Sequence, residues 1–208
     1  YTDGGCPVLL TEPQSTNEVQ YSEPISNEGT SGDITYESFN WSLGFSNCVR
    51  FGDNSVSRFR YAGSVISGNE YTISAFVIMD DLSEPIVGGN SATGDFAFII
   101  GGTAGVPNGN VNYGNNVYRV SATHTSTASS GSNGIIKYNT QSNKGFRVVG
   151  FQLEELSYAT SYIPTSGGTA TRLGETVNGA GDASTFNSTE GVLFAEIAAF
   201  DISGISRI

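Results

Sequence analysis

Basic residues are scarce in this 208-residue chain, in which nine Lys and Arg face 20 Asp and Glu. The formal net charge of −11 argues against nucleic acid as a partner, because phosphates are bound chiefly by Lys and Arg. It argues equally against binding to an anionic membrane surface. A neutral polymer or a bound cation is compatible with so acidic a surface.

Long apolar runs are also lacking. No stretch of 18 apolar residues occurs, so we expect no transmembrane helix and no insertion into a membrane. The opening residues YTDGGCPVLL have neither a basic region nor a long apolar core, and they do not have the form of a signal peptide. We expect both ends of the chain to be internal to a longer polypeptide.

Residues that carry catalysis or bind transition metals are few. His124 is the single histidine, and no zinc spacing, phosphate loop or dinucleotide fingerprint appears. The two cysteines, Cys6 and Cys48, are too few for a disulfide framework; a bridge between them and two buried thiols both stay open. Nothing singles out a pair of glycosidase carboxylates among the 20 acids, so a polysaccharide lyase or hydrolase is the least favoured of three hypotheses for the function.

Glycine is abundant, with 27 residues, and short apolar runs alternate with clusters of Gly, Ser, Thr and Asn. This pattern predicts an all-β fold, a β-sandwich of two antiparallel sheets for which we favour the jelly-roll topology. The predicted strands are residues 8–11, 34–43, 48–51, 57–61, 71–79, 96–100, 117–125, 135–138 and 146–153. Residues 101–116 are expected to form a long loop or hairpin tip, because Gly and Asn dominate them.

The character of the chain changes past Thr165. We assign residues 1–165 to the sandwich and residues 166–190, which are polar and rich in Gly, to a linker. The apolar run VLFAEIAAF at 192–200 lies within residues 191–208, which we interpret as the first strand of a truncated following domain. The alternative is that this strand completes the sheet of the first domain.

Three segments of the chain carry a resemblance to a known family. They are CPVLLTEPQSTNEVQYSEPISN at 6–27, NVYRVSATHT at 116–125 and VVGFQLEELSYATSYIPTSGGTATR at 148–172. The first is similar to an opening C-P-x-L-L-x-E-P-Q-x-T-N followed by Y-S-E, and the third to a closing Q-L-E-x-x-x-x-A-T-S-Y-I-P-T. The second is similar to a W-Y-R-V-S strand, with Val117 where Trp is usual. In this order the three segments resemble domains of phage tail fibres and related virion proteins. Such domains look like jelly-roll carbohydrate-binding modules of the family four and nine type, and a concanavalin-like sandwich often follows them.

The resemblance implies a non-catalytic module that binds a polysaccharide or cell-surface glycan, in a virion tail or an extracellular protein. It also implies a structural Ca²⁺ where the last strand meets the first, with Glu12, Gln152 and either Glu154 or Glu155 as oxygen ligands. Solvated acids at a strand end are the alternative. A second hypothesis is a structural or assembly domain of a viral fibre, in contact with sister subunits and without a glycan site.

Sugars stack on flat, exposed aromatic rings. Trp41, the only tryptophan, is the first choice for such a platform, and a buried core tryptophan is the competing interpretation. The remaining candidate rings are Tyr36, Tyr113, Tyr118 and Tyr138. Arg58 and Arg60 alternate along one predicted strand and so share a face, which suggests either recognition of an acidic sugar or ion pairs with the many acids. Asp80, Asp81 and Glu84 form an acidic turn, with calcium binding as the weaker alternative.

Overall fold

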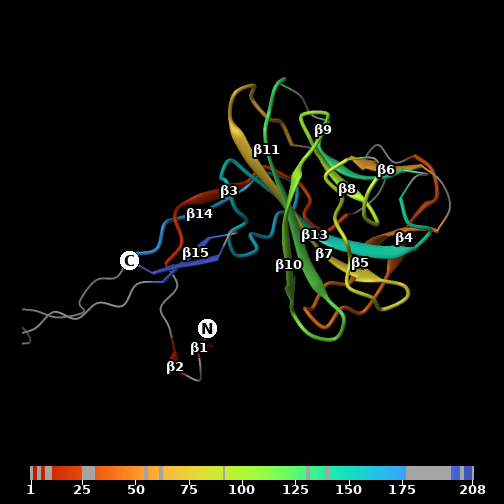
Figure 1. The fold of residues 1–208 in the computed structure, drawn as a ribbon, viewed down its shortest axis with the longest axis horizontal. Coiled ribbons are helices and arrows are strands. Elements are labelled where there is room, and N and C mark those ends of the chain that lie inside the picture. The colour runs from red at the N-terminus through yellow and green to blue at the C-terminus, as the bar shows by residue number, and fades with distance from the viewer. Residues whose placement is uncertain are drawn as a thin grey trace, which may run out of the picture. The chain divides into compact units, whose positions relative to one another are not determined.

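A computed structural model describes most of the chain (Figure 1). The described residues are 2–3, 6–7, 11–24, 31–53, 56–60, 63–90, 92–129, 132–138, 141–176, 198–201 and 204–207. For residues 2–3, 6–7, 60, 198–201 and 204–207 only the backbone is described. The chain divides into two compact units, Gln14–Leu173 and Tyr1–Pro13 with Gly174–Ile208.

The described part of the chain is all-β, as the sequence predicts. The larger sheet has six strands in the order β10-β11-β7-β13-β5-β4, and every neighbouring pair is antiparallel. Its strands are β4 (Ile34–Ser38), β5 (Asn47–Phe51), β7 (Glu70–Met79), β10 (Val106–Asn112), β11 (Tyr118–Thr125) and β13 (Phe146–Glu154). Within the part that the structure describes, no helix is long and apolar enough to cross a membrane.

The smaller sheet has four strands in the order β6-β12-β8-β9, again antiparallel. They are β6 (Ser57–Arg60), β8 (Ala97–Ile100), β9 (Thr103–Ala104) and β12 (Gly134–Lys137). Three further sheets have two strands each: β3 (Ser15–Asn17) with β14 (Ala170–Arg172), β1 (Thr2–Asp3) with β2 (Cys6–Pro7), and β15 (Ala198–Asp201) with β16 (Gly204–Arg207).

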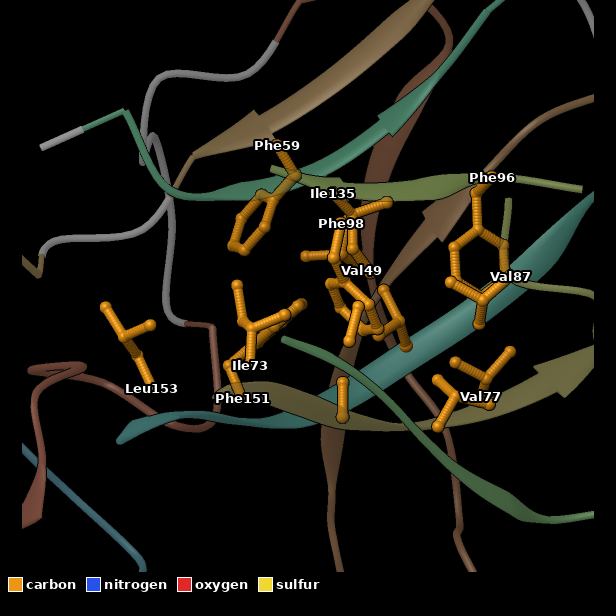
Figure 2. Packing of buried hydrophobic residues seen from close by; sticks show 14 of the residues in the cluster. Val49, Phe59, Ile73, Val77, Val87, Phe96, Phe98, Ile135, Phe151 and Leu153 are labelled. Atoms are coloured by element: carbon orange, nitrogen blue, oxygen red, sulfur yellow. The ribbon is translucent and has the colours of Figure 1, made fainter. Parts of the chain in front are cut away.

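The two sheets pack face to face as a β-sandwich. Phe59, Phe98 and Ile135 of the smaller sheet meet Val49 and Phe151 of the larger one in a single buried cluster (Figure 2). Apolar side chains fill this layer because alternate residues of each strand point into it. The jelly-roll connectivity stays a prediction.

Strand β7 shows the predicted alternation most clearly. One face carries residues of the main core, namely Tyr71, Ile73, Ala75, Val77 and Met79. The other face carries Phe76 and Ile78, which belong to a second buried cluster on the outer side of the larger sheet. The strand is therefore buried on both faces, so its sequence is apolar nearly throughout.

Strand β13 contains a bulge that the sequence analysis did not predict. Its pairing with β7 shifts register between Val149 and Gln152, at Gly150. Phe146 and Val148 face the main core before the bulge, and Phe151 and Leu153 face it afterwards. Gly150 has a φ of 66°, and a Cβ there would lie 2.6 Å from a ring carbon of Phe76. The bulge sends Gln152 and Glu154 to the outer face of the larger sheet.

The structure differs from the predicted boundaries in several places. The strand predicted at 34–43 ends at Ser38. Strand β10 lies within residues 101–116, which were predicted as a long loop or hairpin tip. The larger compact unit continues past Thr165 to Leu173, because β14 pairs with β3 in the segment assigned to the linker. Of the run at 192–200, only residues 198–200 lie among the described residues, and they pair with β16. Residues 8–10 of the first predicted strand also lie outside them.

Candidate functional site

The candidate site is a pocket on the smaller sheet. Its volume is about 150 Å³. The lining residues are Arg58, Phe59, Ile99, Gly102, Ser132, Asn133, Gly134, Ile135, Ile136 and Tyr138. Arg58 lies opposite Ile136, and Ile99 lies opposite Gly134. These residues alternate with Phe59, Phe98 and Ile135 of the core, so the pocket lies on the outer face of the sheet.

Arg58 is held in place by the hydrogen bonds of its backbone. Its N–H donates to the carbonyl of Ser31 at 2.8 Å, and its own carbonyl accepts from Ser31 at 2.9 Å. Strand β12 pairs with it on the other side, at Ile136. Its exposed guanidinium forms no side-chain hydrogen bond or ion pair with any residue that the structure describes.

Tyr138 follows β12 directly and is fixed by Gln141. The side-chain oxygen of Gln141 accepts from the backbone N–H of Tyr138 at 2.9 Å, while the Gln141 N–H donates to the Tyr138 carbonyl at 3.1 Å. Gln141 itself donates to the carbonyl of Thr93 at 2.7 Å. Within the described part of the chain, the hydroxyl of the half-buried Tyr138 has no hydrogen-bond partner.

Asn133 lines the pocket and is held in place by two hydrogen bonds. It is fully buried; its amide donates to the carbonyl of Gly63 at 2.7 Å, and its oxygen accepts from Gly101 at 2.9 Å. Ile136, which is buried, and Ile99, which is half-buried, add apolar side chains to the lining. The pocket therefore combines apolar side chains with two polar groups, those of Arg58 and Tyr138, that have no partner among the described residues.

Trp41 does not form the predicted stacking platform. Only 2 % of its surface is exposed, because its ring packs edge-on against Phe39 and Phe45, with ring centroids 5.5 and 6.3 Å apart. The segment between β4 and β5 folds over the outer face of the larger sheet and buries the indole in the second cluster. The competing interpretation, a core tryptophan, is confirmed.

The predicted tyrosines are scattered over the sandwich. Tyr36 and Tyr118 are half-buried against the main core, and Tyr36 meets Phe59 edge-on at 6.5 Å. Tyr36 also lines a second hollow of about 220 Å³, with Pro24, Glu37, Ser38, Asn47 and Cys48. Tyr113 is exposed, as expected for its loop, and its ring meets Phe76 at 5.3 Å.

The arginines other than Arg58 have different surroundings. Arg60 lies opposite Gly134 in β6, and its side chain is outside the described part of the structure. Arg119 is buried on the outer face of the larger sheet, where it donates to Ser74 at 3.1 Å and lies over the ring of Phe76 at 5.6 Å. The pocket thus brings together Arg58 and Tyr138, and no other predicted site residue.

Gln152 and Glu154 fasten the segment that follows β13. The Glu154 carboxyl accepts from the Ser15 hydroxyl at 2.6 Å and from the N–H and hydroxyl of Thr160. The Gln152 oxygen accepts from the N–H of Ile163 at 2.6 Å. Both side chains are fully buried, and Ile163 packs down beside them. We call residues 155–165 the clasp.

The predicted calcium ligands have other partners. Glu12 belongs to the other compact unit, where its N–H donates to the Glu175 carboxylate at 3.2 Å. Within the described part of the chain, no three His, Cys, Asp or Glu side chains form a group that would hold a metal ion. The Ca²⁺ site stays a prediction, whereas the clasp gives Gln152 and Glu154 a structural role.

The three carboxylates of the acidic turn after β7 contact different partners. Asp80 pairs with Arg50 at 2.5 Å and with Arg147 at 2.7 Å, and Asp81 pairs with Lys144 at 2.9 Å. Hydrogen bonds from Ser83, with Lys144 beside them, lower the pKa of Asp81 to about 2. Glu84 accepts from Asn110. These contacts match the predicted charged turn.

Several residues that line the pocket were not predicted from the sequence, namely Ile99, Gly102, Ser132, Asn133 and Ile136. They come from segments far apart in the chain, and a single sequence does not reveal which strands become neighbours. The sequence held a signal for Ile136, because an apolar residue on the outer face of a short strand has to be covered by other groups.

No protein-family model matches this chain, and no curated protein matches it.

Proposed function

We propose that this protein is a non-catalytic carbohydrate-binding module, in a virion tail or an extracellular protein, and that it binds a polysaccharide or cell-surface glycan in the pocket on the smaller sheet. The observation that carries the proposal is that the apolar side chains of Ile99 and Ile136 line the same pocket as the polar groups of Arg58 and Tyr138, which have no side-chain partner among the described residues. A sugar ring presents apolar C–H faces and a rim of hydroxyls, and such a surface complements both.

The volume of the pocket limits the size of the ligand that we expect. Its volume of about 150 Å³ is below the ~300–1,000 Å³ of pockets for drug-sized molecules. One sugar unit of a longer chain suits it better than a whole oligosaccharide. Binding at one such site is expected to be weak, and repetition of the module would raise avidity.

Affinity electrophoresis tests this function. The whole chain is run through gels that contain single soluble polysaccharides, neutral and acidic, beside Tyr138→Ala and Tyr113→Ala variants of checked thermal stability. We expect at least one polysaccharide to retard the native chain and the Tyr113→Ala variant, and the Tyr138→Ala variant to lose that retardation. Absence of retardation in every gel contradicts the proposal, and loss confined to Tyr113→Ala places the site elsewhere.

Assembly with sister subunits is the second candidate function, and one observation favours it. Strand β10 is an edge strand of the larger sheet, and its Val106 and Val111 are 67 % and 59 % exposed. An unpaired edge with apolar side chains invites association with another chain. Light scattering decides: a mass that rises with protein concentration and returns to the monomer in Val111→Lys supports assembly, whereas a constant monomer mass contradicts it.

A further inference from the structure

Arg58 differs from the cations of this acidic chain that form ion pairs. The ion pairs of the described residues engage Arg50, Arg147 and Lys144, each with a carboxylate at or beside the acidic turn. Arg50 and Arg147 even share Asp80. Arg119 and Lys137 have no carboxylate partner either, but each donates side-chain hydrogen bonds, whereas the Arg58 guanidinium has no partner among the described residues.

The position of Arg58 at the pocket indicates which kind of group could pair with its guanidinium. Its backbone is held between Ser31 and β12, so the base of the side chain is fixed at the pocket. The pocket wall beside it is apolar at Ile99 and Ile136, which offer the guanidinium no acceptor. A carboxylate or sulfate group in the pocket would supply the missing acceptor, and the planar fork of arginine matches either group with two hydrogen bonds.

We propose that the pocket selects an acidic sugar residue, whose carboxylate or sulfate group accepts hydrogen bonds from Arg58 while its ring lies against Ile136 and Tyr138. This inference rests on the proposed carbohydrate-binding function and names the ligand class of the same site. The net charge of −11 repels anionic polymers at long range. Recognition is therefore local, and it depends on this one side chain.

The test uses matched pairs of polysaccharides and matched variants. Each acidic polysaccharide is compared with the same polymer after carboxyl reduction or desulfation, so that only the charge changes. Dissociation constants are measured for the native chain, Arg58→Gln, Arg58→Lys and Arg50→Gln. The last variant removes the same charge from the larger sheet, away from the pocket. Thermal unfolding confirms that each variant is folded.

We expect the native chain to bind the acidic member of at least one pair more tightly. Arg58→Gln should weaken that binding by about 10- to 100-fold, because a charge-assisted pair of hydrogen bonds is lost. Arg58→Lys should recover part of the affinity, and Arg50→Gln should match the native chain. The pair that responds, carboxylated or sulfated, identifies the source of the anionic group.

Two results overturn the inference and are distinct from each other. Equal binding to both members of every pair, or equal affinity of Arg58→Gln and Arg50→Gln, refutes acidic-sugar recognition and leaves the carbohydrate-binding function standing. Failure of the native chain to bind any polysaccharide, acidic or neutral, removes the carbohydrate-binding function and the inference with it.

Discussion

Glu154 and Glu155 are adjacent carboxylic acids with different surroundings. Glu154 is fully buried and accepts hydrogen bonds from Ser15 and Thr160, which tie the clasp to β13. Glu155 is exposed and accepts from Asn69 at 2.8 Å and from the Tyr71 hydroxyl at 3.1 Å. The sequence places this pair of acids at the end of a strand, but it does not show which of them is buried.

Glu154→Ala is expected to lower the free energy of unfolding by about 2–3 kcal/mol. The substitution leaves the buried donors of Ser15 and Thr160 without an acceptor, and an unsatisfied buried group is costly. Glu155→Ala is the matched control and should cost less than ~1 kcal/mol, because water can replace the lost contacts. Urea denaturation of both variants measures the difference; equal losses would contradict the assigned role of Glu154.

Cys48 gives the protein a pH-dependent stability. The structure holds it as a free, buried thiol in the second cluster. Burial first, and the charge of Glu37 second, raise the pKa of this thiol from 9.0 to about 11. Above pH 9 the unfolded chain loses the thiol proton while the folded chain keeps it, so stability falls as pH rises towards 11.

Cys48→Ala should remove this part of the pH dependence. We expect the native chain to lose up to ~2.5 kcal/mol more between pH 9 and pH 11 than the variant does. The variant is less stable at neutral pH, since a small cavity remains, but its profile is flatter. Guanidinium denaturation at several pH values measures both profiles. Parallel profiles would show that folding does not raise the pKa of the Cys48 thiol.

Trp41 marks the limit of residue-scale prediction. Its aromatic neighbours Phe39 and Phe45 were visible in the sequence, yet they fit an exposed platform and a buried cluster equally well. The direction in which the segment after β4 folds depends on the outer face of the larger sheet. That face offers Phe76, Ile78 and Val149, which are far away in the chain, as the partners that bury the indole.

At the scale of elements, regular patterns were easier to predict than interruptions. Strand β7 was predicted correctly because apolar side chains alternate along one of its faces over the whole length, from Tyr71 to Met79. Strand β10 was missed because its sequence, VPNGNVN, is made of turn-forming residues between two valines. It is an edge strand with mostly exposed side chains, so burial imposed no alternation on its sequence.

The bulge in β13 is the element-scale feature that positions the clasp. Gly150→Ala should destabilise the fold by about 1–3 kcal/mol, since the residue has a φ of 66° and a Cβ would meet the Phe76 ring. Gly168→Ala is the control: a Cβ there meets nothing within 4 Å, and a change within ~0.5 kcal/mol is expected. Thermal unfolding of both variants provides the comparison. Similar midpoints would mean that the bulge tolerates a side chain.

At the scale of the whole sandwich, the two outer faces differ. The outer face of the larger sheet is covered by the second cluster and, beside it, by the clasp that Gln152 and Glu154 hold. The outer face of the smaller sheet keeps a pocket with Arg58 and Tyr138 at its wall. The β-sandwich was predictable from the strand pattern, but this difference was not, because it depends on which loops fold back over which sheet.

The most direct test of the central claim is a map of backbone amide chemical shifts during titration with an oligosaccharide from a retained polysaccharide. We predict that the largest changes occur at Gly102, Asn133, Gly134 and Ile136, around the pocket of the smaller sheet. Changes that instead cluster at Tyr113 and Arg119, on the larger sheet, would contradict the account, as would a spectrum that stays unchanged at saturating oligosaccharide.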